Sequence, residues 1–297
     1  MKNKMILTAV ILSGALCACG TENAPPATAD IPEQETVTAA VEETTGEADE
    51  ISAQKEEASP EKTKEAAPDP APAADDTYED DTYEKEEIKM KDPVLLYMGH
   101  ASLRIVTGDD KVIYIDPFAG DAYDLSADLI LQTHDHFDHK DMSKIKNRNE
   151  DCVIITQDEA LKDGEHHSFD LSYVKVEAVE AGYNKNHDKN SCTGYILTFE
   201  NNVSLYISGD TSKTDQMEEL GKRGLDYAFF CCDGIFNMDV SEASGCAGLV
   251  GAKVSIPYHT ASAAVTIFDE ANAARFSVPG AMILKPGEEL SLTKQDN

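Results

Sequence analysis

The stretch Thr-His-Asp-His-Phe-Asp-His at residues 133–139 follows the apolar run Leu129–Leu131 after one intervening residue, Gln132. Three of the eight histidines and two aspartates fall within six consecutive residues of this stretch. His134 and His136 are two residues apart, so both can face the same side of a loop at the end of a strand. Imidazole and carboxylate groups are ligands for zinc and similar divalent ions. The stretch therefore predicts a metal site, with histidines of an ordinary polar surface loop as the weaker alternative.

Short apolar runs alternate with turn signals through the region 92–297, which is typical of a layered α/β domain. The runs 103–106 and 111–115 flank a turn that contains Gly108 and Asp109, and this pattern predicts a β-hairpin. The other expected strands cover residues 94–98, 128–132, 152–156, 173–179, 194–199, 203–207, 227–231, 254–256 and 282–284. Helices are expected at residues 215–222, 240–250 and 268–275.

Acidic residues dominate the charge of the chain, with 56 Asp and Glu against 25 Lys and Arg and a net charge of −31. Residues 20–91 hold 22 of the acidic and 6 of the basic residues and show no hydrophobic period, so a disordered tether is expected over 19–91. As a flexible coil the tether would reach about 45 Å. The charge argues against a nucleic-acid binder, which needs a basic surface. After residue 20 there is no apolar run of about 20 residues, which excludes a polytopic membrane protein.

The first 18 residues have the parts of an export signal, with two lysines, a short apolar run and small residues before a cleavage point. The segment 16–19 resembles a bacterial lipobox, which implies that Cys19 becomes the lipidated first residue of the mature protein. An ordinary signal peptide with an incidental cysteine is the alternative. We therefore expect an exported protein that contacts the membrane only through a lipid anchor and carries a globular domain at 92–297.

The spacing His-x-His-x-Asp-His at residues 134–139 resembles the signature of the metallo-β-lactamase-fold hydrolases. The segment 205–211 resembles the strand that ends in the aspartate bridging two metals, and 255–259 resembles the strand that carries the final histidine. Upstream, 98–102 and 115–118 resemble the branch that includes the ascorbate-6-phosphate lactonase. The resemblance implies a four-layer αββα sandwich with metals between the two sheets at one edge.

The resemblance also implies a ligand set for two divalent ions. His134 and His136 would bind the first ion. Asp138, His139 and His259 would bind the second ion, and Asp210 would bridge both. The third ligand of the first ion stays open, with His187 favoured over His166 and His167, which lie in a polar turn.

Other residues near these motifs have two interpretations each. Asp116 either orients a ligating histidine or is an acid at a strand end before a proline turn. His100 either lines the pocket or packs beneath the site, and packing is favoured. The segment 233–238 could shape the substrate pocket. After cleavage five cysteines would remain besides the lipidated Cys19, and we expect no structural disulfide among these five.

The function expected from the resemblance is hydrolysis of an ester, lactone, amide or phosphoester of a small molecule. A hydroxide between two ions, Zn²⁺ in the first place and Mn²⁺ as the alternative, would attack, and Asp138 would move the proton. β-Lactam hydrolysis is disfavoured because the flanking motifs resemble a different branch and a fold does not determine a substrate. The competing hypothesis is a non-catalytic surface lipoprotein that binds metal or another ligand.

Overall fold

The computed structural model describes residues 91–261 and 266–296. The predicted signal peptide, Cys19 and the predicted tether up to residue 90 lie outside the described residues. In the part that is described, no helix is long and apolar enough to cross a membrane.

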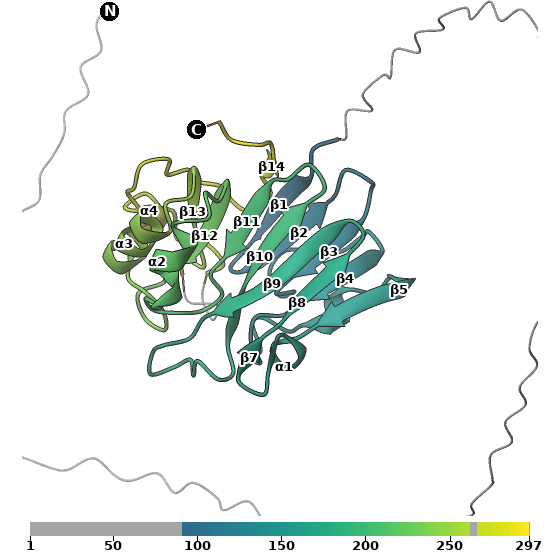
Figure 1. Ribbon diagram of the computed structural model, residues 1–297, viewed down its shortest axis with the longest axis horizontal. Helices are drawn as coiled ribbons and strands as arrows, with labels where there is room; N and C mark the ends of the chain where they lie inside the picture. The colour runs from purple at the N-terminus through teal and green to yellow at the C-terminus, as the bar shows by residue number, and fades with distance from the viewer. Residues whose placement is uncertain (1–90, 262–265, 297) are drawn as a thin grey trace, which may run out of the picture. The chain divides into compact units, whose positions relative to one another are not determined.

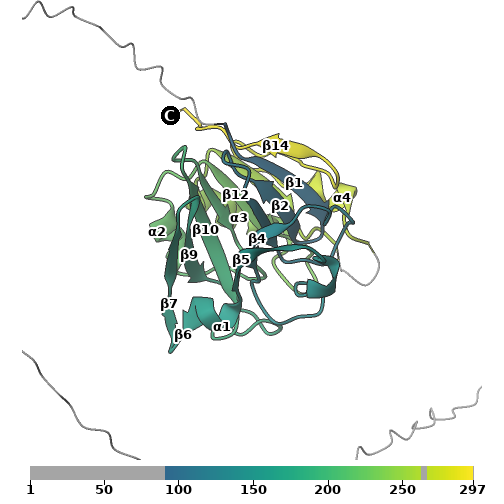
Figure 2. The same ribbon diagram turned by 90° about the vertical axis from the view of Figure 1, so that its right-hand side faces the viewer.

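Two six-stranded sheets lie face to face (Figures 1 and 2). The first sheet has the order β14 (Glu289–Ser291), β1 (Val94–Gly99), β2 (Ser102–Val106), β3 (Val112–Ile115), β4 (Ala127–Leu131) and β5 (Arg148–Ile155). The second has the order β13 (Val254–Tyr258), β12 (Tyr227–Cys231), β11 (Ser204–Ile207), β10 (Thr193–Phe199), β9 (Val174–Glu180) and β8 (Ser168–Leu171). A separate pair is formed by β6 (Leu161–Lys162) and β7 (Glu165–His166).

Each sheet contains three neighbouring parallel strands, and these position the site. β3, β4 and β5 run parallel in the first sheet, and β11, β12 and β13 run parallel in the second. The carboxyl ends of parallel strands lie at one edge of a sheet. Loops that follow β3, β4, β11 and β13 can therefore meet at a common edge of the sandwich.

The core lies between the sheets and follows the period of two expected of strands. In β3, Ile113 and Ile115 belong to the large cluster between the sheets, whereas Val112 and Tyr114 belong to a smaller cluster on the outer face. In β4, Leu129 and Leu131 likewise face the large cluster. Burial on both faces explains why these strands read as continuous apolar runs.

The outer layers of the sandwich differ on its two sides. Helix α3 (Val240–Val250) packs against β12 and against α2 (Gln216–Leu220) (Figure 1). After α4 (Glu270–Ala273), the N–H of Ser277 donates to Ser244 Oγ of α3 at 3.1 Å. On the outer face of the first sheet, Tyr123 and Ile145 pack in the smaller cluster, and the described helical structure in segment 117–147 is one 3-10 turn, η1 (Met142–Lys144). The sandwich of the predicted fold class is confirmed, but a loop takes the place of an expected helical layer.

Most expected elements are present, and one strand prediction is wrong. The hairpin of β2 and β3 forms, and α3 covers the predicted range. The strand expected at 282–284 is absent, and Ala281 beside this segment makes a single bridge to Ser255. The strand that pairs with β1 on the side away from β2 is β14. β14 reads Glu-Leu-Ser, and three residues with one apolar side chain carry no periodic signal.

Gly209, just after β11, has φ of +61°, and an added Cβ would stand 2.6 Å from the carbonyl oxygen of Thr193. We expect Gly209→Ala to lower the free energy of unfolding by roughly 2–3 kcal/mol, because backbone strain and overpacking add. Gly224 is the matched control, with φ of +65° and no atom within 4 Å. Gly224→Ala should cost only about 1 kcal/mol. Urea titrations of both variants test this, and equal losses would contradict it.

Candidate metal centre

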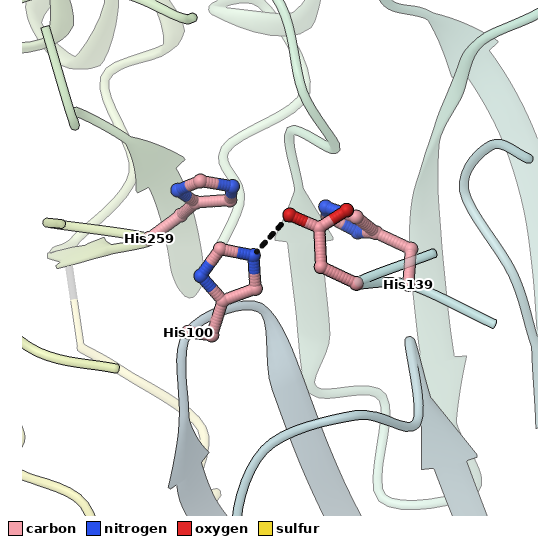
Figure 3. Close-up of side chains that lie close together, drawn as sticks. His100, His139 and His259 are labelled. Carbon is pink, nitrogen blue, oxygen red and sulfur yellow. Dashed lines mark ion pairs between the residues drawn. The ribbon is translucent and has the colours of Figure 1, made fainter. Parts of the chain in front are cut away.

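Side chains from both sheets converge where the loops after β3, β4, β11 and β13 meet. The segment 134–139 follows β4, Asp210 follows β11, and His259 follows β13. His187 comes from the loop between β9 and β10, and His100 from the turn between β1 and β2. Figure 3 shows His100, His139 and His259 side by side, although they come from three separate parts of the chain.

His134, His136 and His187 form the first group, with possible ligand atoms within 4.8 Å of one another. Their ring centroids are 4.5 to 5.0 Å apart. His134 and His187 are buried and His136 is exposed, so this group opens to solvent on the side of His136. The structure thus brings His187 to the cluster. His166 lies in β7, and the backbone of His167 pairs with Ala160 and Ala178.

The second group consists of His100, Asp138, His139 and His259. The Nε2 atom of His100 is 3.3 Å from Asp138 Oδ2, and the rings of His100 and His259 have centroids 3.7 Å apart. The three histidines are buried, and Asp138 is partly exposed. His100 therefore faces the site. The role favoured from the sequence, packing beneath the site, does not describe its position fully.

Asp210 connects the two groups. Its Oδ2 atom is 3.6 Å from His139 Nε2, 3.4 Å from His187 Nε2 and 3.2 Å from His259 Nε2. Burial opposes ionisation of this carboxyl, but the neighbouring His259 and His139 outweigh burial and hold its pKa well below the usual value. Asp210 is therefore an anion between histidines of both groups.

The histidines differ in their electrostatic environment. Burial lowers the pKa of His134 and His187, and their histidine neighbours act in the same direction. Burial also works against charge on His139 and His259, but there the carboxylate of Asp210 outweighs it and raises both pKa values. In the metal-free protein, His139 and His259 are thus the preferred sites for protons.

Asp116, directly after β3, is a buried carboxylate that orients the loop carrying the histidines. Its Oδ1 accepts from the backbone N–H of Thr133 at 2.8 Å. Its Oδ2 accepts from Thr133 Oγ1 at 2.7 Å and lies 2.8 Å from His139 Nδ1. A proton on Nδ1 leaves Nε2 of His139 free to bind a cation. This contact is the one expected if Asp116 orients a ligating histidine.

Asn237 and Asp233 are polar neighbours that the sequence analysis did not assign individually. The Nδ2 of Asn237 donates to Asp210 Oδ2 at 2.7 Å and to Asp233 Oδ2 at 2.8 Å. Asp233 Oδ2 also lies 3.5 Å from His259 Nδ1. Their segment, 233–238, was noted as a pocket-shaping loop after a buried strand, but nothing in its spacing indicates which residue reaches the site.

Three of the seven described non-glycine residues with positive φ belong to this centre. His100, Asp116 and His259 have φ values of +51°, +45° and +44°, in the left-handed region that residues with a Cβ seldom adopt. Such conformations persist only where the surrounding structure enforces them, and they are enriched at functional sites.

The donor set fits a divalent metal. His134 Nε2, His139 Nε2 and Asp210 Oδ1 are buried and form no hydrogen bond with the described residues. Buried polar atoms without partners are costly. Two donors about 2.0–2.1 Å from one tetrahedral ion stand about 3.3 Å apart, and the spacings around Asp210 Oδ2 are 3.2 to 3.6 Å. Each of these histidine nitrogens is therefore separated from Asp210 Oδ2 by the distance expected between two ligands of one ion.

Asp116→Asn should weaken metal binding about 10–100-fold. The asparagine amide would place an N–H donor against His139 Nδ1, which must then be the unprotonated nitrogen of the ring. The proton of the neutral imidazole would lie on Nε2, the nitrogen that faces the site, and would block metal binding there. The measurement is competition for Zn²⁺ against a chromogenic chelator. Asp128→Asn is the control, because Asp128 is a buried carboxylate near the other end of β4 that accepts from Val112 N and Lys111 Nζ. Similar losses in both variants would show a general destabilisation instead.

Comparison with known proteins places the chain in a family. A sequence model of the beta-lactamase superfamily domain matches residues 94–259, from β1 to His259. A protein named UPF0173 metal-dependent hydrolase in Geobacillus thermodenitrificans is 31% identical over 224 residues, covering 66% of this chain and 98% of the relative. One from Nitratidesulfovibrio vulgaris is 28% identical over 233 residues, covering 67% and 95%.

Solved structures agree with this placement. A candidate metal-dependent hydrolase from Parabacteroides distasonis has a TM-score of 0.53 and 30% identity, covering 64% of this chain and 91% of the other. The metallo hydrolase Igni18 from Ignicoccus hospitalis has a TM-score of 0.53 at 18% identity, covering 68% and 99%, which supports the fold alone. The chain therefore belongs to the beta-lactamase superfamily domain family and is a metal-dependent hydrolase with the metallo-β-lactamase fold.

Proposed function

We propose that this hydrolase holds two divalent ions and cleaves an ester, lactone, amide or phosphoester bond in a small molecule. The observation that carries the proposal is the pair of histidine–carboxylate groups joined by Asp210, whose Oδ2 is 3.2 to 3.6 Å from three histidine nitrogens. His134, His136 and His187 would hold the first ion. Asp138, His139 and His259 would hold the second, and Asp210 would contact both. A set rich in imidazole suits Zn²⁺ better than Mn²⁺, which remains the alternative.

Hydrolysis at this site needs an activated water and a group that moves its proton, and Asp138 is the candidate for the second role. Bound divalent ions act as Lewis acids and lower the pKa of water toward 7. Burial opposes ionisation of Asp138, but the contact with His100 and the charge of His139 outweigh it, so the Asp138 pKa lies below its usual value. Asp138 is thus an anion that can accept the proton of water as its oxygen attacks the carbonyl carbon or phosphorus. It returns the proton to the leaving group when that bond breaks.

Exposed apolar side chains near the site favour a substrate with an apolar portion. Phe137, between His136 and Asp138, is 67% exposed, and Ile235 and Phe236 are 61% and 46% exposed. Phe236 directly precedes Asn237, which contacts Asp210. Exposed large apolar groups beside a polar site commonly mark a ligand surface.

The branch, the location and the partners are also part of this proposal. The motifs at 98–102 and 115–118 support a position near the ascorbate-6-phosphate lactonase branch. The lipobox-like segment 16–19 supports export and attachment through Cys19. The acidic composition supports a small-molecule substrate over a nucleic acid. Fatty-acid labelling of the wild type and of Cys19→Ser tests the anchor.

Metal content and turnover of the full chain test the central proposal. We expect two ions per chain and hydrolysis of at least one generic ester, lactone, amide or phosphodiester substrate. The activity should be lost on chelation and restored by Zn²⁺ or Mn²⁺. A protein that binds no divalent ion, or that binds two without turnover on any of these classes, would overturn the proposal.

Loading with metal should release protons at neutral pH. Asp210 raises the pKa of His139 and His259 in the metal-free protein, and a metal binds only the neutral imidazole. Metal affinity should therefore increase as the pH rises through neutrality. Calorimetric titration with Zn²⁺ in two buffers of different ionisation enthalpy measures the protons released. Equal heats in both buffers would argue against protonated histidines at the site.

A further inference from the structure

His100 is a buried histidine that is not among the metal ligands implied by the family resemblance. It is 0% exposed, and neither Nδ1 nor Nε2 forms a hydrogen bond with the described residues. An imidazole buried without a hydrogen-bond partner is costly, on the order of 1–3 kcal/mol. The nearest partner that the polypeptide offers is Asp138 Oδ2, 3.3 Å from Nε2, and such a group calls for a closer one.

The backbone directs this side chain toward the second group. His100 has φ of +51°; its N–H donates to Ile267 O at 2.6 Å, and its carbonyl accepts from His259 N at 2.8 Å. The preceding Gly99 has φ of +105°, and a Cβ there would lie 2.8 Å from Ile267. The strained turn therefore fixes His100 against the strand end that carries His259.

The surroundings of the ring match those of a ligand. His100 Nε2 is 3.3 Å from Asp138 Oδ2, which is at the long limit for a hydrogen bond. Two ligands about 2.0–2.1 Å from one ion stand about 2.9–3.6 Å apart in a five-coordinate arrangement, so this separation also fits two ligands of the same ion. Its possible ligand atom lies within 4.8 Å of those of Asp138, His139 and His259. Figure 3 shows the His100 ring directed toward that carboxylate and beneath His259.

We infer that His100 Nε2 is an additional ligand of the second ion, beside Asp138, His139 and His259. The inference rests on the proposed function, because it needs an ion at this group. It gives the second ion a third imidazole and so matches the number of imidazoles around the first ion. The opposing interpretation is that His100 only donates a hydrogen bond to Asp138 and thereby orients it.

Cobalt(II) substitution of the full chain distinguishes these roles. Each imidazole bound to Co²⁺ gives one paramagnetically shifted, exchangeable N–H resonance in the proton spectrum. His100→Gln should lose one such resonance and should weaken binding of the second ion by at least about tenfold. Glutamine keeps a side-chain N–H that can donate to Asp138, so a purely orienting role would survive the change.

Two control variants test whether the number of shifted N–H resonances reports the number of bound imidazoles. His187→Gln should also lose one resonance, and His167→Gln, at a residue outside both groups, should lose none. A structure of the cobalt-loaded wild type provides a measurement that does not depend on any variant. His100 Nε2 should lie within about 2.3 Å of an ion.

The outcomes separate the two proposals. Cobalt binding with the full number of resonances in His100→Gln, or an ion more than 3 Å from His100 Nε2, would overturn the ligand role and leave the proposed function intact. A wild-type protein that binds no cobalt at all would overturn both.

Discussion

Asp138→Asn should lower kcat about 10²–10⁴-fold, the contribution typical of a positioned general base. Asp138 is a partly exposed carboxylate at the second group, and its Oδ2 lies 3.3 Å from His100 Nε2. Asparagine has a similar shape but cannot accept a proton at neutral pH. The first ion, held by the group of His134, His136 and His187, should remain. Steady-state kinetics with metal analysis of the same sample measure both effects.

Asp135→Asn is the matched control for this result. Asp135 lies three residues earlier in the same loop, and its exposed carboxylate pairs with Lys140 Nζ at 2.7 Å. It belongs to none of the ligand groups, so kcat should stay within twofold or so, as expected for surface substitutions. Wild-type turnover in Asp138→Asn would show that another group moves the proton.

Asp210→Asn should have the largest effect on metal binding, with a loss of more than about 100-fold. Removing a partner of a ligand already costs about 10–100-fold, and Asp210 is within 3.6 Å of three histidine nitrogens from both groups. An amide carries no charge to balance the ions, and its N–H₂ is a donor facing them. Chelator competition and metal content should both decline, and turnover should follow.

Asp226→Asn separates this effect from the loss of any buried carboxylate. Asp226 is 1% exposed and accepts from Ser204 N at 2.8 Å and Lys294 Nζ at 2.9 Å. It directly precedes β12, so it lies near the strand ends opposite those followed by Asp210 and His259. Asp226→Asn should destabilise folding but leave metal affinity unchanged. If both variants lose metal equally, the bridging role of Asp210 is wrong.

Local patterns were sufficient to predict a layered α/β domain, and the family resemblance added the arrangement of two sheets between helical layers. β1, β3 and β4 are short apolar runs bounded by turn signals, and such runs identify buried strands from sequence alone. The match of α3 to its predicted range has the same origin, because Asp239 accepts from Glu242 N and Gly251 ends the helix with φ of +58°. β14 and the loop over the first sheet were not predictable in this way, since their positions depend on distant strands.

The candidate site likewise contains some residues that the sequence predicted and others whose contacts depend on distant parts of the chain. The segment 134–139 predicts a metal site by itself, because its possible metal ligands are close together in the chain. They therefore stay close together in any loop at a strand end. The resemblance added Asp210 and His259, each at the end of a recognisable strand. His187 was favoured over two other histidines only by its place after a strand, and Asn237 and His100 carried no sequence signal for their contacts.

The sequence alone determined the strand-and-helix pattern and the short run of donors after β4, because both depend on neighbours a few residues apart. Only the tertiary structure showed that His187 and not His166 or His167 joins this cluster, and that His100 and Asn237 contact it. It pairs two sheets so that the ends of their parallel strands share an edge, and it bends His100, Asp116 and His259 into left-handed backbone conformations there. These contacts arise from packing between segments up to about 160 residues apart, and no local period encodes such distances.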